Sequence, residues 1–498
     1  MSSTSIKPDA ATFRAQLAAG KPQLVYTTLV SDLETPVSAM LKLKDDRSPS
    51  FLLESVEGGE VRGRYSIIGL EPDLLWRCMG NKPEISRKPP FADDSFEPAW
   101  DDSISSLKKL ARDITMDIPE GLPPMAAGLI GYLSYDMVKL MERLPDSNPD
   151  HLGIPDSCFM RPTLVLVFDS VDGLVYIIAP VWPDSNTDYD GAVAKIESVI
   201  SRLQGPIDQR NYYQDRETAA LNFTSNVSEP DYHAMVNKAK EYIVAGDIFQ
   251  VVPSQRFEAP FTLPPFAMYR SLRRMNPSPF LFYIHFGHFT LVGSSPEILV
   301  RVRNGKVTIR PIAGTRRRGK DAAEDRALEQ DLLNDPKEIA EHMMLLDLGR
   351  NDVGRIAKIG SVKVTQEMVI EHYSHVMHIV SNVEGDLDEK YDAIDALIAG
   401  FPAGTVSGAP KIRAMEIIDE LENTRRGFYA GGTGYLSANG SMDICINLRT
   451  ALIKDGKIYA QAGGGVVADS DPAAEYQESV NKAKAVMRAA ELAGKYVR

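Results

Sequence analysis

The sequence predicts an α+β fold built in layers. Strand-like runs, rich in β-branched and aromatic residues, follow one another at short spacing over about 249–314 and again over about 427–467. A fold of alternating β–α units would instead place a helical pattern between successive strands. A further pair of runs over 162–181 is divided by an Asp-Gly turn at 170–173 and predicts a β-hairpin. A layered α+β arrangement is therefore expected rather than a doubly wound parallel sheet.

At 498 residues the chain is long enough for two or three domains. We expect an N-terminal region over 1–205 and a C-terminal region over 230–498, joined by a polar, weakly periodic linker over 206–229. Helical periodicity resumes at the end of that linker, in EPDYHAMVNKAKEYIVAG, where Gly246 is placed to end the helix. Strands of the two regions could also interleave within one compact unit.

Composition and charge limit the partners of the chain. It is 44% hydrophobic and 25% charged, as soluble globular proteins are, and its net charge of −13 argues against nucleic acid as a bulk partner. Its basic cluster, Arg316 to Arg318, is too short to follow a phosphate backbone. No apolar run reaches the ~18 residues of a membrane span, and the N-terminus has no apolar signal core. Three scattered cysteines imply no disulfide framework, so we expect a cytoplasmic protein.

Two glutamate pairs at helical spacing are the main functional signal. Glu338 and Glu341 follow an Asp-Pro helix start, and so do Glu475 and Glu478. Residues three apart share a helix face, and four converging carboxylates would repel one another unless a hard cation lay between them. Mg²⁺ prefers such oxygen ligands and binds beside anionic substrates. A single ExxE pair is ordinarily a solvent-exposed pair without a function. Here the second helix also follows the glycine loop 463–465, whose backbone amides are not shielded by side chains and could bind an anion. We therefore expect a magnesium-dependent enzyme for a small anion.

Other motifs carry weaker signals. The loop 401–414 leads into a helix with Lys411 but lacks P-loop spacing, so it predicts a carboxylate-binding turn rather than a nucleotide site. His372, His375 and His378 share neither a helix face nor a strand face as a set, so they predict no metal triad. One catalytic histidine among them stays open. The glycines of YAGGTGYL predict close backbone approach, and neither a nucleophile elbow nor a dinucleotide fingerprint is present.

Five segments taken together resemble one known family. PIAGTRRRG, AEHMMLLDLGRND, HYSHVMHIVS, FPAGTVSGAPK and AGGGVVADSDPAAEYQE occur in the order found in chorismate-utilising enzymes, and the resemblance covers about 229–498. Farther upstream, LLESVEGGEVRGRYSIIG (52–69) resembles the N-terminal segment of anthranilate synthase large components. The resemblance implies an α/β/β/α sandwich with two antiparallel-rich sheets. It also implies amination of chorismate at C2 with loss of the 4-hydroxyl, then pyruvate elimination to anthranilate, the first step of tryptophan biosynthesis.

The resemblance also implies how substrate and metal are held. Glu341 and Glu478 would bind Mg²⁺ directly, with Glu338 and Glu475 beside them through water, and the ion would hold the ring carboxylate of chorismate. Arg449 would pair with the enolpyruvyl carboxylate, a task that suits its planar guanidinium. The other implied substrate contacts are Tyr429 and the backbone of Gly463 and Gly465 at the enolpyruvyl carboxylate, and the lining positions Gly314, Thr315 and Thr405.

Four positions carry the implied chemistry. Hydroxide leaves poorly, so the reaction needs a general acid, and Glu297 in GSSPEILV matches that of the family. His378 matches the histidine near the ring, which would assist hydroxyl departure or the elimination. Gln250 stands where family members that add water carry a lysine base, which favours ammonia as the nucleophile. Ala313 stands where aminodeoxychorismate synthases commonly carry a lysine, which favours amination at C2 over C4.

The resemblance implies a protein partner and a regulator. No cysteine lies in a glutaminase-type elbow, so ammonia would come from a separate glutaminase subunit, in a heterotetramer with two copies of each subunit. Tryptophan would inhibit by feedback, because Glu54, Ser55, Pro279, Phe280 and Leu281 resemble the inhibitor pocket. These five residues could instead be ordinary packing between two domains. An inhibitor there can act only by favouring a conformation that binds substrate or partner more weakly.

Three alternatives stay open. The same fold could make 4-amino-4-deoxychorismate, or a degenerate member could serve as a tryptophan-binding scaffold without catalysis. Retention of all four glutamates, Glu297 and His378 argues against the scaffold. A di-iron carboxylate oxygenase also uses ExxE pairs, but those sites lie in four-helix bundles with Glu-x-x-His, and the glycine-rich strands contradict that fold.

Overall fold

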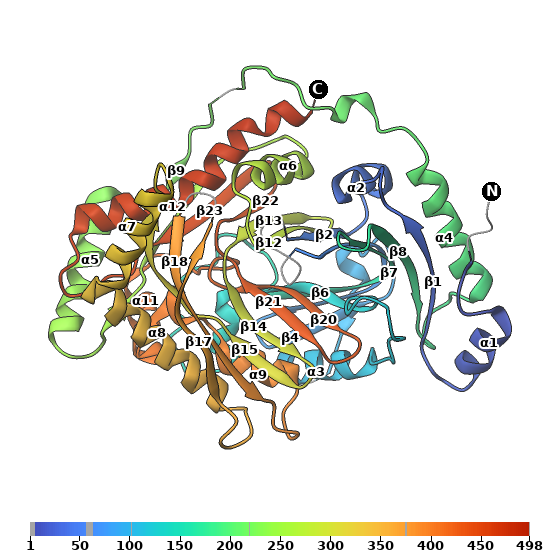
Figure 1. The fold of residues 1–498 in the computed structure, drawn as a ribbon, viewed down its shortest axis with the longest axis horizontal. Helices are drawn as coiled ribbons and strands as arrows, with labels where there is room; N and C mark the ends of the chain where they lie inside the picture. The colour runs from blue at the N-terminus through green and yellow to red at the C-terminus, as the bar shows by residue number, and fades with distance from the viewer. Residues whose placement is uncertain (1–4, 56–62, 101, 219, 374–375, 498) are drawn as a thin grey trace.

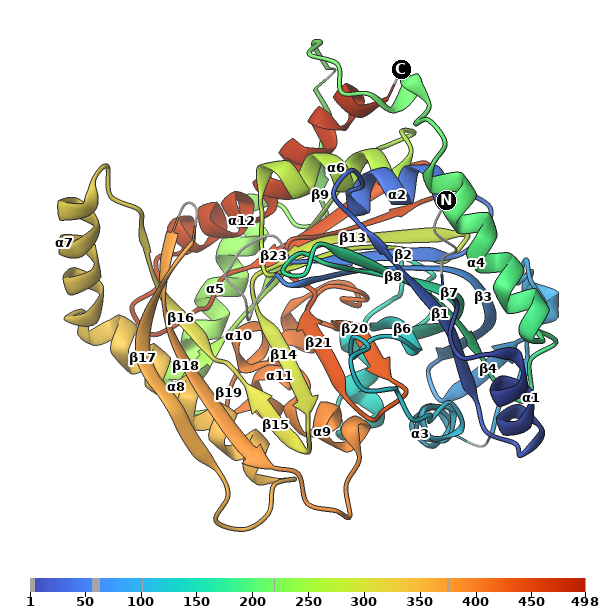
Figure 2. The same ribbon diagram turned by 45° about the vertical axis from the view of Figure 1, so that its right-hand side comes forward.

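The computed structural model describes residues 5–55, 63–100, 102–218, 220–373 and 376–497. Within them the strands form two stacked antiparallel sheets with helices against their outer faces. In Figure 2, strands β13, β2 and β8 lie beneath helices α6, α2 and α4, and β14, β15, β20 and β21 form the layer below. The predicted layered α+β fold is confirmed, including its two antiparallel-rich sheets.

The first sheet combines strands from both ends of the chain. Every neighbouring pair in it is antiparallel. In spatial order its strands are β9 (Thr224–Ser225), β11 (Ser254–Pro260), β23 (Lys457–Gly463), β22 (Thr450–Lys454), β13 (Phe289–Ser295), β12 (Phe280–His285), β2 (Ser50–Glu54), β3 (Tyr65–Met79), β7 (Ser157–Asp169), β8 (Leu174–Val181) and β1 (Gln23–Val30).

The second sheet begins on the far halves of β3 and β7 and is antiparallel throughout its recorded pairs. Strands β15 and β16 both pair with one side of β18, and β17 pairs with the other. Its strands are β5 (Glu97–Pro98), β4 (Lys82–Ser86), β6 (Gly128–Leu133), β20 (Gly432–Ser437), β21 (Met442–Ile446), β14 (Ile298–Arg303), β15 (Lys306–Ile309), β16 (Ile312–Arg317), β17 (Lys363–His372) and β18 (Val376–Asp386). A separate short ladder joins β10 (Gln250–Val251) to β19 (Gly408–Ala409).

Strands β3 and β7 pass from one sheet into the other. The register between them shifts between Pro72 and Leu74, and Glu71 adopts a φ of 49°. A bulge of this kind bends its strand and increases the local twist, and proline is tolerated there because no ladder donor is needed from it. The two sheets are therefore joined by continuous strands rather than by loops alone.

The helices cover the outer faces of the two sheets (Figure 1). Against the first sheet and its neighbouring helices pack α1 (Ala10–Ala18), α2 (Pro36–Leu43), α4 (Tyr189–Leu203), α5 (Glu229–Val244), α6 (Pro265–Met275) and α12 (Pro472–Leu492). Against the second sheet and the small ladder pack α3 (Ser103–Asp113), α7 (Ala322–Leu333), α8 (Pro336–Gly354), α9 (Ala393–Gly400), α10 (Gly404–Ser407) and α11 (Lys411–Leu421). Short 3₁₀ turns are η1 (Asp93–Ser95), η2 (Tyr135–Leu140), η3 (Gln209–Asn211) and η4 (Ala493–Tyr496).

The period-2 pattern of β12 shows how the first sheet divides two cores. Phe282 and Ile284 join the core between the sheets, whereas Leu281 and Tyr283 join the core beneath the helices. All four side chains are at most 1% exposed. Successive residues of a strand point to opposite faces, so the continuous apolar run FLFYI fits a strand that is covered on both sides.

Several local predictions are confirmed. The hairpin at 162–181 is β7–β8, and the helix that ends before Gly246 is α5, with this glycine at a φ of 85°. The glycines of YAGGTGYL do mark close approach, because a Cβ on Gly434 would lie 2.0 Å from the Asp443 carbonyl oxygen. Strand β17 was not anticipated. Among the described residues, no helix is both long and apolar enough to cross a membrane.

Strands of the two predicted regions pair with one another. Strand β2 pairs with β12 and β6 pairs with β20, so each partnership joins the N-terminal and the C-terminal part of the chain. The segment predicted as a linker contributes β9, which pairs with β11. The division of the chain into an N-terminal region, a linker and a C-terminal region stays a prediction.

Candidate active site

Glu297 is a buried carboxyl group on the short connection between β13 and β14. Its side chain is 6% exposed, and the Thr405 hydroxyl at the start of α10 donates to Oε1 at 3.2 Å. Burial raises the pKa of Glu297 to about 8, against the lowering effects of the Thr405 hydrogen bond and the nearby Arg449 charge. At neutral pH this carboxyl group is therefore largely protonated and able to donate a proton.

His378 lies on β18, opposite Thr315 of β16. Its Nδ1 is 3.3 Å from the Gly314 carbonyl oxygen and 2.9 Å from the Thr315 hydroxyl. A carbonyl oxygen only accepts, so the contact with Gly314 places the ring proton on Nδ1 and leaves Nε2 as an acceptor. Burial, and then the Arg449 charge, lower the pKa of His378 to about 4, so the ring is neutral at neutral pH.

Arg449 connects these two groups electrostatically. It lies between β21 and β22 with a φ of 47°, and its carbonyl oxygen accepts from the Ser294 amide at 3.2 Å. Its positive charge acts on both Glu297 and His378, which places one cation beside the buried acid and the neutral imidazole. Three residues that are far apart in the sequence thus form one cluster.

Tyr429 and the glycine loop after β23 lie together. Burial raises the pKa of Tyr429 to about 12, and its hydroxyl accepts from the Gly463 amide. A Cβ on Gly465 would lie 2.4 Å from the Gln250 amide nitrogen, so a larger residue here would displace the Gln250 side chain. The predicted substrate-binding residues of this loop therefore lie beside Gln250.

The two glutamate pairs approach one another at the N-terminal ends of α8 and α12. The aspartate caps are confirmed: Asp335 accepts from the first-turn amides of α8, and Asp471 does so in α12. Burial raises the pKa of Glu341, and Glu338 and Glu478 contribute to that rise. Burial also raises the pKa of Glu475, again with a contribution from Glu478.

Small residues make room for these carboxylates. A Cβ on Gly464 would lie 2.7 Å from Glu475 Oε2 and 3.7 Å from Glu478 Oε1, and one on Gly314 would lie 3.3 Å from Glu338 Oε2. Glu341 Oε1 accepts from the amide of Gln250 at 3.0 Å. The candidate metal ligands are all carboxylate oxygen atoms. Their negative charges repel one another, and a hard divalent cation would offset that repulsion.

Two basic side chains balance part of this charge. Lys482 lies 2.7 Å from Glu478 and donates to the Gly463 carbonyl oxygen at 3.2 Å. Arg316 donates to Glu338 at 2.9 Å. Over the described ranges, no three acidic, histidine or cysteine side chains already converge as a ligand set. Mg²⁺ keeps several waters and needs only one or two carboxylates, so the donor set still fits this ion.

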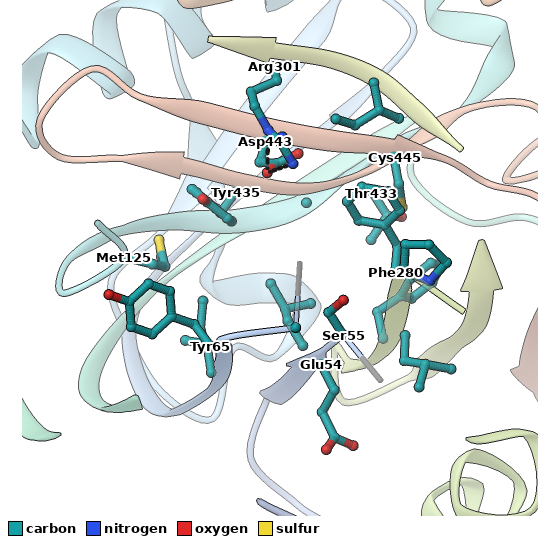
Figure 3. A pocket seen from close by; sticks show the side chains of 18 of the residues that line it. Glu54, Ser55, Tyr65, Met125, Phe280, Arg301, Thr433, Tyr435, Asp443 and Cys445 are labelled. Carbon is teal, nitrogen blue, oxygen red and sulfur yellow. Dashed lines mark hydrogen bonds and ion pairs between the residues drawn. The ribbon is translucent and has the colours of Figure 1, made fainter. Parts of the chain in front are cut away.

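The residues predicted for inhibitor binding line one cavity of about 360 Å³ (Figure 3). Ser55, Pro279, Phe280 and Leu281 contribute to its wall, with Thr433, Tyr435 and Cys445 of the second sheet opposite. Glu54 also lines it, but in Figure 3 its carboxylate points away from the other labelled side chains. That carboxylate accepts from Arg273 at 2.7 and 2.9 Å and from the Tyr269 hydroxyl.

This cavity and the buried acid share a segment of chain. Pro296 and Ile298 line the cavity and are the two neighbours of Glu297. Ile312 lines it too, and its amide donates to Glu297. The cationic wall of the cavity is internally paired, since Arg301 lies 2.8 Å from Asp443. A change in the shape of the cavity would therefore act directly on the peptide that carries Glu297.

Residues of the weaker sequence motifs contact acidic side chains of the same chain. Arg316 of the basic cluster bonds to Asp331 and Asp335 besides Glu338. Lys411 donates to the Asp352 carboxylate at 2.6 Å. His372 Nε2 is 3.8 Å from a Glu329 carboxylate oxygen, and His375 lies outside the described residues. Two buried residues of this region, Arg426 and Glu422, were not singled out from the sequence. Nothing in ENTRRG distinguishes them from surface charges.

The chain belongs to the family described as chorismate binding enzyme, which it matches over residues 75–488. Two of its relatives are bacterial anthranilate synthase component 1 proteins. It is 57% identical to the one of Cereibacter sphaeroides, over 96% of this chain and 97% of that protein. It is 49% identical to the one of Pseudomonas aeruginosa, over 94% of this chain and 95% of that protein.

Solved structures agree with this assignment. Anthranilate synthase component I of Streptococcus pneumoniae superposes with a TM-score of 0.78 at 38% identity, covering 92% of this chain and 99% of that one. The menaquinone-specific isochorismate synthase of Escherichia coli superposes with a TM-score of 0.71 at 19% identity, covering 97% of this chain and 100% of that one. At that identity the second comparison bears on the fold alone.

Proposed function

We propose that the chain converts chorismate and ammonia to anthranilate. The observation that carries this proposal is the buried carboxyl of Glu297, whose pKa of about 8 keeps a proton available beside Arg449 and the neutral His378. Replacing a ring hydroxyl by an amine requires protonation of a poor leaving group, and an acid with a pKa near the working pH is suited to that task. Membership of the family supports chorismate as the substrate.

In this proposal the carboxylates of chorismate set its orientation. Arg449, the Tyr429 hydroxyl and the backbone of Gly463 and Gly465 hold the enolpyruvyl carboxylate. Glu297 then donates its proton to the departing 4-hydroxyl, and ammonia attacks C2. Neutral ammonia carries its own lone pair and needs no base, so the amide of Gln250 is compatible with amination, whereas water would need a base at that position.

The elimination step requires a proton acceptor for the hydrogen on C2. His378 is suited to this, because its Nδ1 proton faces the Gly314 carbonyl oxygen and its Nε2 carries a lone pair. Loss of the C2 proton and of the enolpyruvyl group as pyruvate makes the ring aromatic. Before that step the imidazole is neutral, because burial and the Arg449 charge lower its pKa to about 4.

We further propose that Mg²⁺ binds through Glu341 and Glu478, with Glu338 and Glu475 beside it through water. The ion would orient the ring carboxylate and offset the charge of the substrate. The raised pKa values of Glu341 and Glu475 support this, because they report the mutual repulsion and burial that a divalent cation would relieve.

A separate glutaminase subunit is proposed as the source of ammonia, in an assembly of two large and two small subunits. A glutaminase nucleophile must be an accessible thiolate. Cys78, Cys158 and Cys445 are all buried, and burial raises the pKa of Cys78 to about 12 and that of the other two still further. The component 1 names of the relatives fit a second component.

The proposed regulator is tryptophan, bound in the cavity of about 360 Å³ beside Ser55 and Phe280. That volume suits one amino acid of this size. Because Pro296 and Ile298 belong to the cavity wall, an occupant would favour a position of Glu297 that lowers catalysis.

The first test is a fluorescence assay of the purified chain with chorismate, Mg²⁺ and ammonium at mildly alkaline pH. Fluorescent anthranilate that disappears with EDTA and is suppressed by tryptophan is the expected result. Consumption of chorismate without fluorescence would replace this product by a sister product such as 4-amino-4-deoxychorismate. No consumption, with or without a glutaminase, would favour the non-catalytic scaffold.

A further inference from the structure

Arg426 is a buried cation directly behind the proposed substrate site. It is 1% exposed and lies in the segment between α11 and β20. Its Nε donates to both carboxylate oxygens of Glu422, at 3.1 and 3.0 Å. Its Nη1 donates to the Val406 carbonyl oxygen at 2.7 Å, and its Nη2 to that of Val252 at 2.5 Å. One guanidinium therefore ties together three separate segments of the chain.

Two of these segments lead directly to proposed catalytic groups. Val406 follows Thr405, whose hydroxyl donates to Glu297. Val252 lies two residues after Gln250, directly after the end of β10. Backbone shifts at either carbonyl would be transmitted within one or two residues to Thr405, which bonds to Glu297, or to Gln250, whose amide donates to Glu341.

The flat faces of Arg426 reach a third group. Its guanidinium carbon lies 5.4 Å from the ring centroid of Tyr429 and 4.7 Å from that of Tyr135. The Arg426 charge acts against the rise in the pKa of Tyr429 that burial causes. A cation beside this ring also makes the Tyr429 hydroxyl a better donor to a carboxylate.

Glu422 extends the network to the glycine loop. Its Oε1 accepts from the Ser254 amide at 2.9 Å and from the Ser254 hydroxyl at 2.8 Å. Ser254 is the residue opposite Gly463 in the pairing of β11 with β23. The carboxylate thus fixes the strand that presents the Gly463 amide.

We propose that the Arg426–Glu422 pair is a positioning unit that holds the carboxylate-binding wall and the acid of the active site in register. This inference rests on the proposed function. A buried ion pair is a poor source of stability, because the loss of hydration offsets its attraction. The hydrogen bonds of the pair explain it better by geometry: Arg426 and Glu422 together fix the segments that carry Thr405, Gln250, Tyr429 and Gly463.

Arg426→Lys tests this positioning role. Lysine keeps the charge but is a single point donor, so it cannot bond at once to Glu422, Val406 and Val252 in one plane. We expect a KM for chorismate about 10-fold higher and a kcat about 10- to 100-fold lower per folded molecule, as misplacement of catalytic groups by about 1 Å produces. Circular dichroism would give the fraction of folded protein in each sample, and kcat would be calculated per folded molecule.

Arg161→Lys is the matched control. Arg161 on β7 is 2% exposed, donates to Asp73 at 2.7 and 2.8 Å, and lies 4.5 Å from the Trp182 ring centroid. It repeats the buried, paired and stacked environment of Arg426 without contacts to the proposed site. Its substitution should lower the melting temperature and leave kcat and KM within about two-fold of wild type. Equal kinetic losses in both variants would overturn the positioning role.

A second readout separates positioning from general destabilisation. The Thr405 hydrogen bond lowers the pKa of Glu297, so loosening the Thr405 segment should move the alkaline limb of the kcat profile to higher pH in Arg426→Lys. The milder variant Ser254→Ala, which keeps the ion pair, should raise the KM by about 3- to 10-fold with little change in kcat. If the unmodified protein makes anthranilate and Ser254→Ala has an unchanged KM for chorismate, this inference is overturned. The proposed function would then remain intact.

Discussion

Glu297 is the residue whose environment most directly predicts a measurable rate. Its pKa of about 8 means that the protonated, donating form dominates below pH 8 and is lost as the pH rises above it. We expect kcat to fall on the alkaline side with an apparent pKa near 8. In Glu297→Gln, kcat should fall by about 10²- to 10⁴-fold, the usual contribution of a general acid.

The control for this prediction is Glu389→Gln, a substitution of a glutamate whose side chain is 90% exposed and pairs only with Lys358 at 2.9 Å in the recorded contacts. It should leave the pH profile unchanged. An alkaline limb that survives unaltered in Glu297→Gln would assign that limb to another group.

A second residue-scale prediction concerns Arg449. A planar guanidinium can bond to both oxygens of a carboxylate, and lysine cannot. Arg449→Lys should raise the KM for chorismate by about 10-fold or more, the equivalent of one lost charge-assisted hydrogen bond. Steady-state kinetics with varied chorismate would measure it, and a wild-type KM would refute the carboxylate clamp.

Residues differ in how far the sequence could predict them. The glutamate pairs stood out by spacing, because a helix start and a three-residue interval are local properties. Glu297 and His378 were assigned only through the family resemblance, since burial and a neighbouring Arg449 are products of tertiary structure. Arg426 was missed for the same reason: its partners Val252 and Val406 are distant in sequence, and ENTRRG alone resembles a solvated turn.

At the scale of elements, helices α8 and α12 act as a pair. Both begin with an aspartate cap and a proline, which fixes where the glutamates of their first two turns point. We expect Glu341→Gln to abolish Mg²⁺-dependent turnover while the protein stays folded. Glu491→Gln, near the other end of α12 and paired with Arg488, should keep the wild-type response to Mg²⁺.

Titration of the free protein with Mg²⁺ by calorimetry would add a readout that is independent of turnover. Wild type should bind the ion and Glu341→Gln should bind it more weakly. Unchanged turnover and unchanged binding in Glu341→Gln would remove the metal from these helices.

Elements with a local signal were predictable and their pairing was not. The β7–β8 hairpin and helix α5 follow from turn and cap residues that are adjacent in sequence. Strand β17 was missed because its residues are mostly polar or half-exposed, and register shifts between Val364 and Gln366 and between Gln366 and Val369 interrupt its alternation. The partnership of β2 with β12 has no local signal at all, because each strand is simply an apolar run.

At the scale of the whole molecule, the cavity lies between the two sheets and borders the segment of Glu297. We expect Ser55→Leu, which fills part of this cavity, to abolish inhibition by tryptophan and to leave kcat within about two-fold of wild type. Ser105→Leu on the exposed face of α3 should keep full sensitivity. Full sensitivity in Ser55→Leu would move the inhibitor to another part of the molecule.

The pairing of distant strands also shapes how the protein is made. During synthesis β2 is complete at Glu54, but its partner β12 begins only at Phe280. The interval between β6 and its partner β20, which begins at Gly432, is longer still. At roughly 5–20 residues per second, the nascent chain carries these unpaired edges for on the order of ten seconds or more. Open strand edges invite pairing with other chains. The yield of active protein should therefore depend on chaperones that hold the growing N-terminal part, more than the stability of the finished molecule would indicate.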